Sequence, residues 1–353
     1  MATIDPGQDI ATLTAALVDV FSESGHEQEL ADAVAAALQP LGHLTVTRDG
    51  DAVVARSEWG RSERVLLAGH LDTVPPADNL PSVREAGVLR GLGSSDMKGG
   101  IAVMLRLAAS VMRGPRDVTY VFYDGEEVES ERNGLLRLTR QHPEWLAADF
   151  AVLLEPTDAI VEGGCQGTMR VEVMVPGARA HSARSWMGVN AIHAAGEVLQ
   201  RLREYEPRRP NVDGLEFREG MNAVAITGGV AGNVVPGECV VSVNYRFAPD
   251  RSEAEAEAHV RAVFSGYELT VTDSAPGARP GLHEPAASGF LAAIGGEPRA
   301  KFGWTDVARF SVLGVPAVNY GPGDPNVAHT PGEWVREEQL TECEAKLSAW
   351  LFT

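Results

Sequence analysis

The chain has 353 residues, 44% of them hydrophobic and 22% charged, which predicts a globular protein long enough for two domains and a large core. Its formal net charge of −19 argues against nucleic acid and anionic membranes as partners, and the lack of any apolar run of about 18 residues argues against a transmembrane helix. Three scattered cysteines without a Cys-x-x-Cys pair, and an N-terminus without the pattern of a signal peptide, favour a cytoplasmic location.

The first part of the chain alternates helical and extended patterns. Apolar residues recur at helical spacing in some segments, and short apolar runs predict buried strands in others. The expected helices cover 10–21, 27–38 and 97–112, and the expected strands cover 64–68, 118–123 and 150–154. This alternation is typical of an α/β domain with a mostly parallel sheet, in which sites gather beyond the carboxyl ends of the strands.

The pattern changes in the middle of the chain. Strands are expected at 169–175, 223–230, 239–247 and 268–272, with helices at 189–202 and 252–264. Their order, β-α-β-β-α-β, is the ferredoxin-like arrangement. We therefore expect an α+β domain of residues 169–277 inserted into a domain built from 1–168 and 278–353, with a hinge at the Pro/Gly cluster 276–281. The α/β pattern resumes with helices at 285–294 and 306–313, a strand at 317–320 and a C-terminal helix from residue 336.

Polar residues that a buried strand does not need lie at the ends of the predicted strands. Each has an ordinary explanation when taken singly, such as a turn, a helix N-cap or a surface position. The residues are His70 and Asp72 after the first strand, Asp96 before a helix, Glu126 and Glu127 after the next strand, Glu155 after the third and His329 in a late loop.

Taken together, these are five carboxylates and two histidines, nearly all on one rim of the predicted sheet. Burying so much negative charge without cations would be very costly, so we expect a divalent metal there. Imidazole and carboxylate ligands suit Zn²⁺, with Co²⁺ or Mn²⁺ as alternatives. One carboxylate can bridge two ions about 3.5–4 Å apart.

The pattern resembles the dizinc amidohydrolases, a family that includes aminoacylases, acetylornithine deacetylases, carboxypeptidases and succinyl-diaminopimelate desuccinylases. The resemblance covers essentially the whole chain and rests on His70-x-Asp72, "SSDMKGG", Glu126-Glu127, "LEPT" and His329, in that order. It implies an α/β zinc-hydrolase domain, a lid and dimerisation domain, and two Zn²⁺ per subunit, for which Co²⁺ can substitute. The implied ligands are His70, Asp96 and Glu155 for one ion, and Asp96, Glu127 and His329 for the other, with Asp96 as the bridge.

The same resemblance implies three further roles around the metal centre. Asp72 would accept a hydrogen bond from the imidazole of His70 and fix its orientation. Glu126 would be the general base that takes a proton from the attacking water. His181, from the facing subunit of a homodimer, would donate to the carbonyl oxygen that becomes the oxyanion.

Residues that bind the substrate are also implied by the resemblance, and they are Arg184, Asn233, Arg246 and Thr305. A guanidinium suits a carboxylate because it can bind both oxygens at once. The stretches 302–310 and 319–330 most resemble the actinobacterial desuccinylases. That resemblance implies hydrolysis of N-succinyl-LL-2,6-diaminopimelate to succinate and LL-2,6-diaminopimelate, a step in the biosynthesis of lysine.

Other activities remain open at this point. An acetylornithine deacetylase, another N-acyl amino-acid hydrolase or a dipeptidase would use the same metal centre on a different acyl substrate. A metal-free binding protein on the same scaffold would be expected to lack Glu126 or several ligands, and all of them are present. A purely structural oligomer would leave the acidic rim unexplained.

Overall fold

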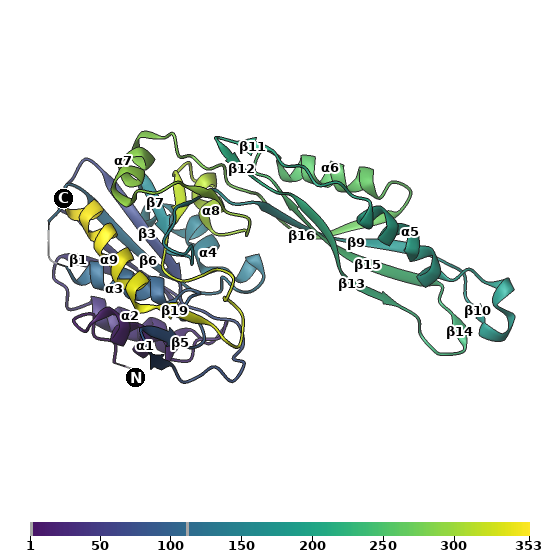
Figure 1. The fold of residues 1–353 in the computed structure, drawn as a ribbon, viewed down its shortest axis with the longest axis horizontal. Coiled ribbons are helices and arrows are strands. Elements are labelled where there is room, and N and C mark those ends of the chain that lie inside the picture. Colours follow the sequence, from purple (N-terminus) through teal and green to yellow (C-terminus); the bar gives the residue numbers. More distant parts are fainter. Residues whose placement is uncertain (1–2, 111–112) are drawn as a thin grey trace. The chain divides into compact units, whose positions relative to one another are not determined.

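A computed structural model describes residues 3–110 and 113–353 (Figure 1). The predicted end of one helix at residues 111–112 lies outside the described residues. The chain divides into two compact units, and each is described here by itself. Unit 1 comprises Met1–Gly163, Pro280–Arg299 and Arg309–Thr353, and unit 2 comprises Gly164–Arg279 and Ala300–Ala308.

The segment Ala300–Ala308 groups with unit 2, whereas the sequence analysis expected it in the domain built from 1–168 and 278–353. Two contacts give the physical reason. The indole Nε1 of Trp304 donates to the carbonyl oxygen of Pro276 at 3.1 Å, and the Sγ of Cys165 lies 3.6 Å from the carbonyl oxygen of Thr305. Sequence patterns did not show these contacts because they join residues far apart in the chain.

Unit 1 is built on an eight-stranded sheet with the order β1-β2-β6-β3-β7-β18-β8-β17. The four central strands β6, β3, β7 and β18 run parallel to one another, which confirms the mostly parallel sheet, while β2 and β8 flank them as antiparallel strands. These strands read as apolar runs because helices cover both faces of such a sheet. The strands are β1 (Leu44–Asp49), β2 (Ala52–Ser57), β3 (Arg64–His70), β6 (Asp117–Tyr123), β7 (Phe150–Leu153), β8 (Glu162–Gly163), β17 (Arg299–Ala300) and β18 (Ala317–Asn319).

Helices and a small second sheet complete unit 1. Helix α3 packs on α1, α9 and β3, and it thereby joins both ends of the chain to the sheet. The small sheet pairs β19 (Trp334–Arg336), β5 (Val88–Arg90) and β4 (Val83–Glu85). The helices are α1 (Ile10–Val18), α2 (Gln28–Leu38), α3 (Lys98–Ala109), α4 (Gly134–Gln141), α7 (Pro285–Ile294), α8 (Val307–Val312) and α9 (Glu337–Phe352), with short 3₁₀ turns at Ser130–Arg132 and Pro143–Trp145.

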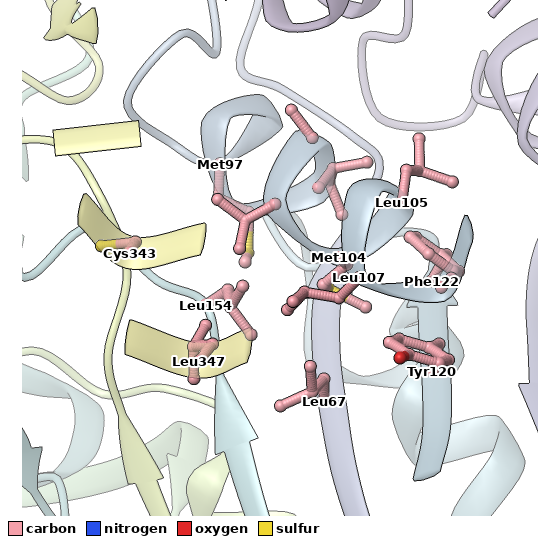
Figure 2. Packing of buried hydrophobic residues seen from close by; sticks show 14 of the residues in the cluster. Leu67, Met97, Met104, Leu105, Leu107, Tyr120, Phe122, Leu154, Cys343 and Leu347 are labelled. Carbon is pink, nitrogen blue, oxygen red and sulfur yellow. The ribbon is translucent and has the colours of Figure 1, made fainter. Parts of the chain in front are cut away.

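The main core of unit 1 surrounds α3. Figure 2 shows apolar side chains of this helix among those of β3, β6 and α9. Burial of each such side chain contributes roughly 1.5–3 kcal/mol relative to exposure. The labelled members of the cluster are Leu67, Met97, Met104, Leu105, Leu107, Tyr120, Phe122, Leu154, Cys343 and Leu347.

Two glycines let α3 approach the strand ends closely. A Cβ atom on Gly100 would overlap the carbonyl oxygen of Leu154, at the end of β7. A Cβ on Gly69 would lie only 2.7 Å from the Cε of Met97 and 2.8 Å from the Cδ1 of Ile101. The helix start therefore lies directly against the strand ends from which the polar residues emerge.

Unit 2 has the predicted β-α-β-β-α-β order. Its four-stranded antiparallel sheet has the order β13-β15-β9-β16. Inward residues of β9 pack against α5 and α6, so exposed and buried positions alternate along the strand. The elements are β9 (Gly167–Pro176), α5 (Ala191–Arg203), β13 (Gly220–Gly228), β15 (Glu238–Phe247), α6 (Glu253–Val263) and β16 (Glu268–Ala275), and a hairpin joins β11 (Asn211–Val212) to β12 (Leu215–Glu216).

Strands β9 and β15 form a long ladder that spans unit 2. Each strand has ten residues, and Pro176 pairs with Glu238 at one end while Gly167 pairs with Phe247 at the other. At about 3.4 Å per residue the ladder is roughly 30 Å long. Beyond the Pro176 end lies a small two-stranded sheet of β10 (Ala180–His181) and β14 (Val234–Val235), with the 3₁₀ segment Ser182–Met187 beside it (Figure 1).

Candidate metal centre and active site

Three neighbouring parallel strands bring several of the predicted metal-site residues to one rim of unit 1. His70 is the last residue of β3 and pairs with Tyr123, the last residue of β6. Glu126 and Glu127 follow β6 closely. On the other side of β3, strand β7 ends at Leu153, two residues before Glu155.

Asp96 lies between two imidazoles. The Nε2 of His70 is 3.2 Å from Oδ1 of Asp96, and the Nε2 of His329 is 3.2 Å from Oδ2 of the same carboxylate. The Nε2 of His329 also lies 2.7 Å from Oε1 of Glu127. The structure thus places one carboxylate where each of its oxygens faces a different histidine, which is the arrangement that a bridging ligand requires.

The donor set of this cluster fits a divalent metal. One ligand atom from each of His70, Asp96 and Glu127 lies within 4.8 Å of the others. Imidazole nitrogen and carboxylate oxygen are the ligand types that Zn²⁺ and similar ions bind. Glu155 is buried, and its charge acts on His70, so a further acidic group lies close by. His329 is half-exposed at the edge of the cluster.

The pKa values of the cluster reflect the close contact between acids and imidazoles. Burial alone would lower the pKa of His70, but Asp96, Glu155 and Asp72 together raise it well above its ordinary value. Hydrogen bonds to Asp96 and Glu127 raise the pKa of His329 to about 10. Burial would raise the pKa of Asp96, but the two imidazoles lower it strongly. Positive charge is therefore strongly favoured at this position.

His329 adopts a backbone conformation that is costly for a residue with a side chain. Its φ of 60° is in the left-handed region, where a residue other than glycine is strained by about 1–3 kcal/mol. Such strain persists only where surrounding contacts hold the residue in place, and it is common at functional sites. Here the conformation accompanies the approach of the imidazole to Asp96 and Glu127.

The contacts of Asp72 correct one detail of the sequence analysis. Nδ1 of His70 donates to the backbone carbonyl oxygen of Asp72 at 3.0 Å, while the nearest oxygen of the Asp72 carboxylate is 3.6 Å away. The carboxylate instead accepts the backbone N–H groups of Glu126 and Glu127, both at 3.0 Å, and the hydroxyl of Ser24 at 2.7 Å. Asp72 therefore holds the loop that carries the two glutamates, and its main chain orients the ring of His70.

Two further buried acids hold the loops of the site, and the sequence analysis gave neither of them a role. Oε1 of Glu27 accepts the backbone N–H of Gly125 at 3.2 Å. Glu333 accepts backbone N–H groups of the loop that carries Asp96. Burial raises the pKa of both carboxyls, that of Glu333 to about 7. In sequence, Glu27 resembles an ordinary acid at a helix start, and only the spacing of Glu333 from His329 could have drawn attention to it.

The predicted substrate residues fall into two groups at opposite ends of unit 2. His181 pairs with Val234 in the small β10–β14 sheet, and the N–H of Ser182 donates to the carbonyl oxygen of Asn233 at 2.9 Å. Arg184 belongs to the adjoining 3₁₀ segment. The other two residues lie at the Phe247 end of the ladder: Arg246 precedes Phe247, and Thr305 contacts Cys165, two residues before Gly167, the partner of Phe247.

The position of His181 fixes which ring nitrogen is available. Its Nδ1 accepts the backbone N–H of Ala183 at 3.1 Å, so the neutral ring carries its proton on Nε2. The side chain is exposed. His181 is thus prepared to donate a hydrogen bond through Nε2 to a group outside unit 2.

A parallel-sheet unit with an imidazole–carboxylate centre at its strand ends, joined to a ferredoxin-like unit, defines a class of metal-dependent hydrolases. Residues 66–352 match the model of peptidase family M20/M25/M40, and the chain belongs to this family. It is 54% identical over 99% of both chains to a Mycobacterium tuberculosis protein provisionally named succinyl-diaminopimelate desuccinylase DapE. It is 45% identical to the succinyl-diaminopimelate desuccinylase of Corynebacterium glutamicum, over 99% of this chain and 98% of that one.

Solved structures show the same fold. YxeP of Bacillus subtilis, described as a dinuclear metal binding peptidase of the M20 family, matches with a TM-score of 0.71. The match covers 97% of this chain and 96% of YxeP, at 15% identity.

Within the part of the chain that the structure describes, no helix is long and apolar enough to cross a membrane.

Proposed function

We propose that the chain is a metal-dependent amidohydrolase that cleaves N-succinyl-LL-2,6-diaminopimelate into succinate and LL-2,6-diaminopimelate in the cytoplasm, within lysine biosynthesis. The hydrolytic chemistry rests on one observation, the contact of both Asp96 oxygens with different imidazoles. The substrate rests on the two desuccinylase relatives, which align with nearly the full length of the chain.

The centre would hold two Zn²⁺ ions, with Co²⁺ as a functional substitute. The contacts among His70, Asp96, Glu127 and His329 support this assignment, as does the proximity of Glu155. The ions would be shared as His70–Asp96–Glu155 and Asp96–Glu127–His329. When bound, Zn²⁺ lowers the pKa of water and polarises a carbonyl oxygen.

Glu126 would be the general base. Its backbone N–H is held by Asp72, while its neighbour Glu127 directs its carboxylate to His329. The carboxylate of Glu126 takes a proton from the attacking water as the water oxygen bonds to the amide carbon. The C–N bond then breaks, and Glu126 delivers the proton to the departing amine nitrogen. Its half-buried position favours this exchange because few water molecules compete for the proton.

The oxyanion donor would come from a second copy of the chain. His181 and Arg246 lie near opposite ends of a ladder roughly 30 Å long, so they cannot act together on one small substrate within a single unit 2. In a homodimer, the facing subunit would supply a His181 beside Arg246, because the first subunit's own His181 lies near the other end of the ladder. The Nε2–H of His181 would then stabilise the carbonyl oxygen as negative charge develops on it.

Exposed apolar side chains on unit 2 support a homodimer. Strand β13 is an edge of the sheet, and its Val224 and Ile226 are 58% and 50% exposed. Trp186 and Met187, close to His181, are 78% and 69% exposed. An uncovered edge strand with apolar side chains is a surface that pairs readily with another chain. A second copy is the partner that also supplies His181.

Recognition of the substrate would depend on cations and hydrogen-bond donors in unit 2. Succinyl-diaminopimelate carries several carboxylates, and the net charge of −19 opposes its approach. Local groups must therefore outweigh the overall field. Arg246 is half-buried, which strengthens its attraction for a carboxylate, and Arg184, Asn233 and Thr305 are the other proposed contacts.

The decisive experiment compares turnover of succinyl-diaminopimelate and N-acetylornithine by purified protein. We expect succinyl-diaminopimelate to be hydrolysed faster, chelation to abolish the activity and added Zn²⁺ to restore it. Preference for acetylornithine would replace the proposed substrate while leaving the chemistry in place. Full activity in protein that elemental analysis shows to be free of metal would overturn the metal-dependent mechanism.

A further inference from the structure

We infer that Glu333 is a positioning residue for the metal centre, because its carboxylate holds the loop that carries Asp96. The inference deepens the proposed function, on which it rests for the role of Asp96. The side chain of Glu333 lies behind the site and makes its hydrogen bonds to main chain, so it acts through Asp96.

Three backbone donors converge on this one carboxylate. Oε2 of Glu333 accepts the N–H of Gly93 at 2.9 Å, and Oε1 accepts the N–H groups of Ser95 at 2.8 Å and Asp96 at 2.9 Å. Glu333 is only 2% exposed, so water does not compete for these bonds. An ionised carboxylate is suited to this position because both of its oxygens accept and neither donates.

Other hydrogen bonds of the loop act at its ends and through a side chain: the N–H of Ser94 donates to the carbonyl oxygen of Gly91 at 3.1 Å, and Oγ of Ser95 donates to that of Asp324 at 3.2 Å. Helix α3 begins directly after the loop, and its N-cap residue, Met97, provides no side-chain hydrogen bond to the helix start. Gly93 has a φ of 74°, in the left-handed region, where glycine is favoured. The orientation of Asp96 toward His70 and His329 therefore depends on the bonds that Glu333 makes to its backbone.

One segment couples the two halves of the centre. Glu333 follows His329 by four residues, so the loop that contributes the exposed histidine also fixes the backbone of the shared carboxylate. The buried Lys98 lies close enough for the charge of Glu333 to act on it, and its Nζ donates to the carbonyl oxygen of Val20 at 2.7 Å.

The test uses Glu333→Gln with Asp117→Asn as a matched control. Asp117 is also a buried carboxylate of unit 1, and it accepts the N–H groups of Trp59 at 2.7 Å and Arg61 at 2.9 Å. It begins β6, whereas the metal centre is beyond the end of that strand. Both substitutions keep the size of the side chain and leave a donor facing backbone N–H groups, so both should lower the thermal unfolding midpoint.

Only Glu333→Gln should weaken binding of Zn²⁺, by about 10–100-fold, the usual effect of losing a group that orients a ligand. Affinity is measured with Zn²⁺ alone, in competition with a chelator and without substrate. The visible spectrum of the Co²⁺-loaded protein should change for Glu333→Gln and not for Asp117→Asn. Glu333→Asp, which keeps the charge but is one methylene shorter, should retain more affinity than Glu333→Gln.

Parental Zn²⁺ affinity in folded Glu333→Gln would overturn the inference, and so would an equal loss in Asp117→Asn. If Glu333→Gln does not fold, parental affinity in Glu333→Asp would overturn it. Because no substrate is used, these results stand apart from the proposed function. A parent protein that binds Zn²⁺ but does not hydrolyse succinyl-diaminopimelate would refute the substrate and leave the role of Glu333 intact.

Discussion

Glu126 and Glu127 are adjacent, and each gives its backbone N–H to one oxygen of Asp72. The roles proposed for their side chains nevertheless differ. Glu127 directs its carboxylate to His329, at 2.7 Å, and belongs to the candidate metal cluster. In the proposed function Glu127 is a ligand and Glu126 the base, although the two side chains have the same chemistry.

Glu126→Gln should lower the turnover rate by at least about 10²-fold, because the amide cannot take up the proton of the attacking water. The metal content should stay at the parental level. Glu127→Gln is the matched control, and it should lose metal as well as activity. Rate assays combined with elemental analysis distinguish the two. Loss of metal from Glu126→Gln, with its activity preserved, would mean that the roles of the two glutamates are reversed.

At the scale of the element, the start of α3 decides how closely the ligand loop approaches the strand ends. Gly100→Ala should destabilise the protein by about 1–3 kcal/mol, because the added methyl group meets the carbonyl oxygen of Leu154 and the helix must shift. Gly289→Ala in α7 is the control, since a Cβ there meets nothing within 4 Å. It should instead stabilise the protein by roughly 0.5–1 kcal/mol. Thermal unfolding midpoints should therefore move in opposite directions, and equal shifts would show that packing against Leu154 is unimportant.

The elements that sequence patterns predicted well are those with long apolar periods. Strands β3, β6 and β7, helix α3 and the six elements of the unit 2 core fall within a few residues of their expected positions. The hairpin β1–β2 was missed, as were strands of two residues such as β8 and β17, because so short a segment carries no period. Motifs indicated the ligands of the candidate centre and also Asp72, but not the part that Glu27 and Glu333 play in holding the loops. The contacts of Glu27 and Glu333 join distant segments, and nothing in the neighbouring sequence specifies them.

At the scale of the whole molecule, the proposed function assigns His181 to the site of a second copy of the chain, because His181 and Arg246 lie near opposite ends of the ladder of unit 2. His181→Ala should lower turnover by about 10²–10³-fold, the effect of losing one oxyanion donor, while zinc content and fold are kept. Mixing it with Glu126→Gln gives a sharper test. In a mixed dimer, the subunit with intact Glu126 receives an intact His181 from its partner, so one of the two sites is complete.

Random exchange of subunits should therefore restore about a quarter of the parental activity, since half of the dimers are mixed and each has one complete site. Activity should be measured alongside the fraction of heterodimer, determined with differently tagged chains. Unmixed samples of each variant serve as controls. Verified heterodimers that remain as inactive as their parents would rule out the role of His181 in the facing site.

The β9–β15 ladder also limits how unit 2 can change during evolution. Insertion of one residue into β9 would turn every following side chain to the opposite face and expose the residues that pack on α5 and α6. Only matched insertions of two residues in both strands preserve the pattern, and each such step adds about 7 Å. Changes in the ladder can therefore alter the distance of His181 from Arg246 only in large steps. Smaller changes in that distance must come from the loops around the β10–β14 sheet and from the 3₁₀ segment, where length can vary one residue at a time.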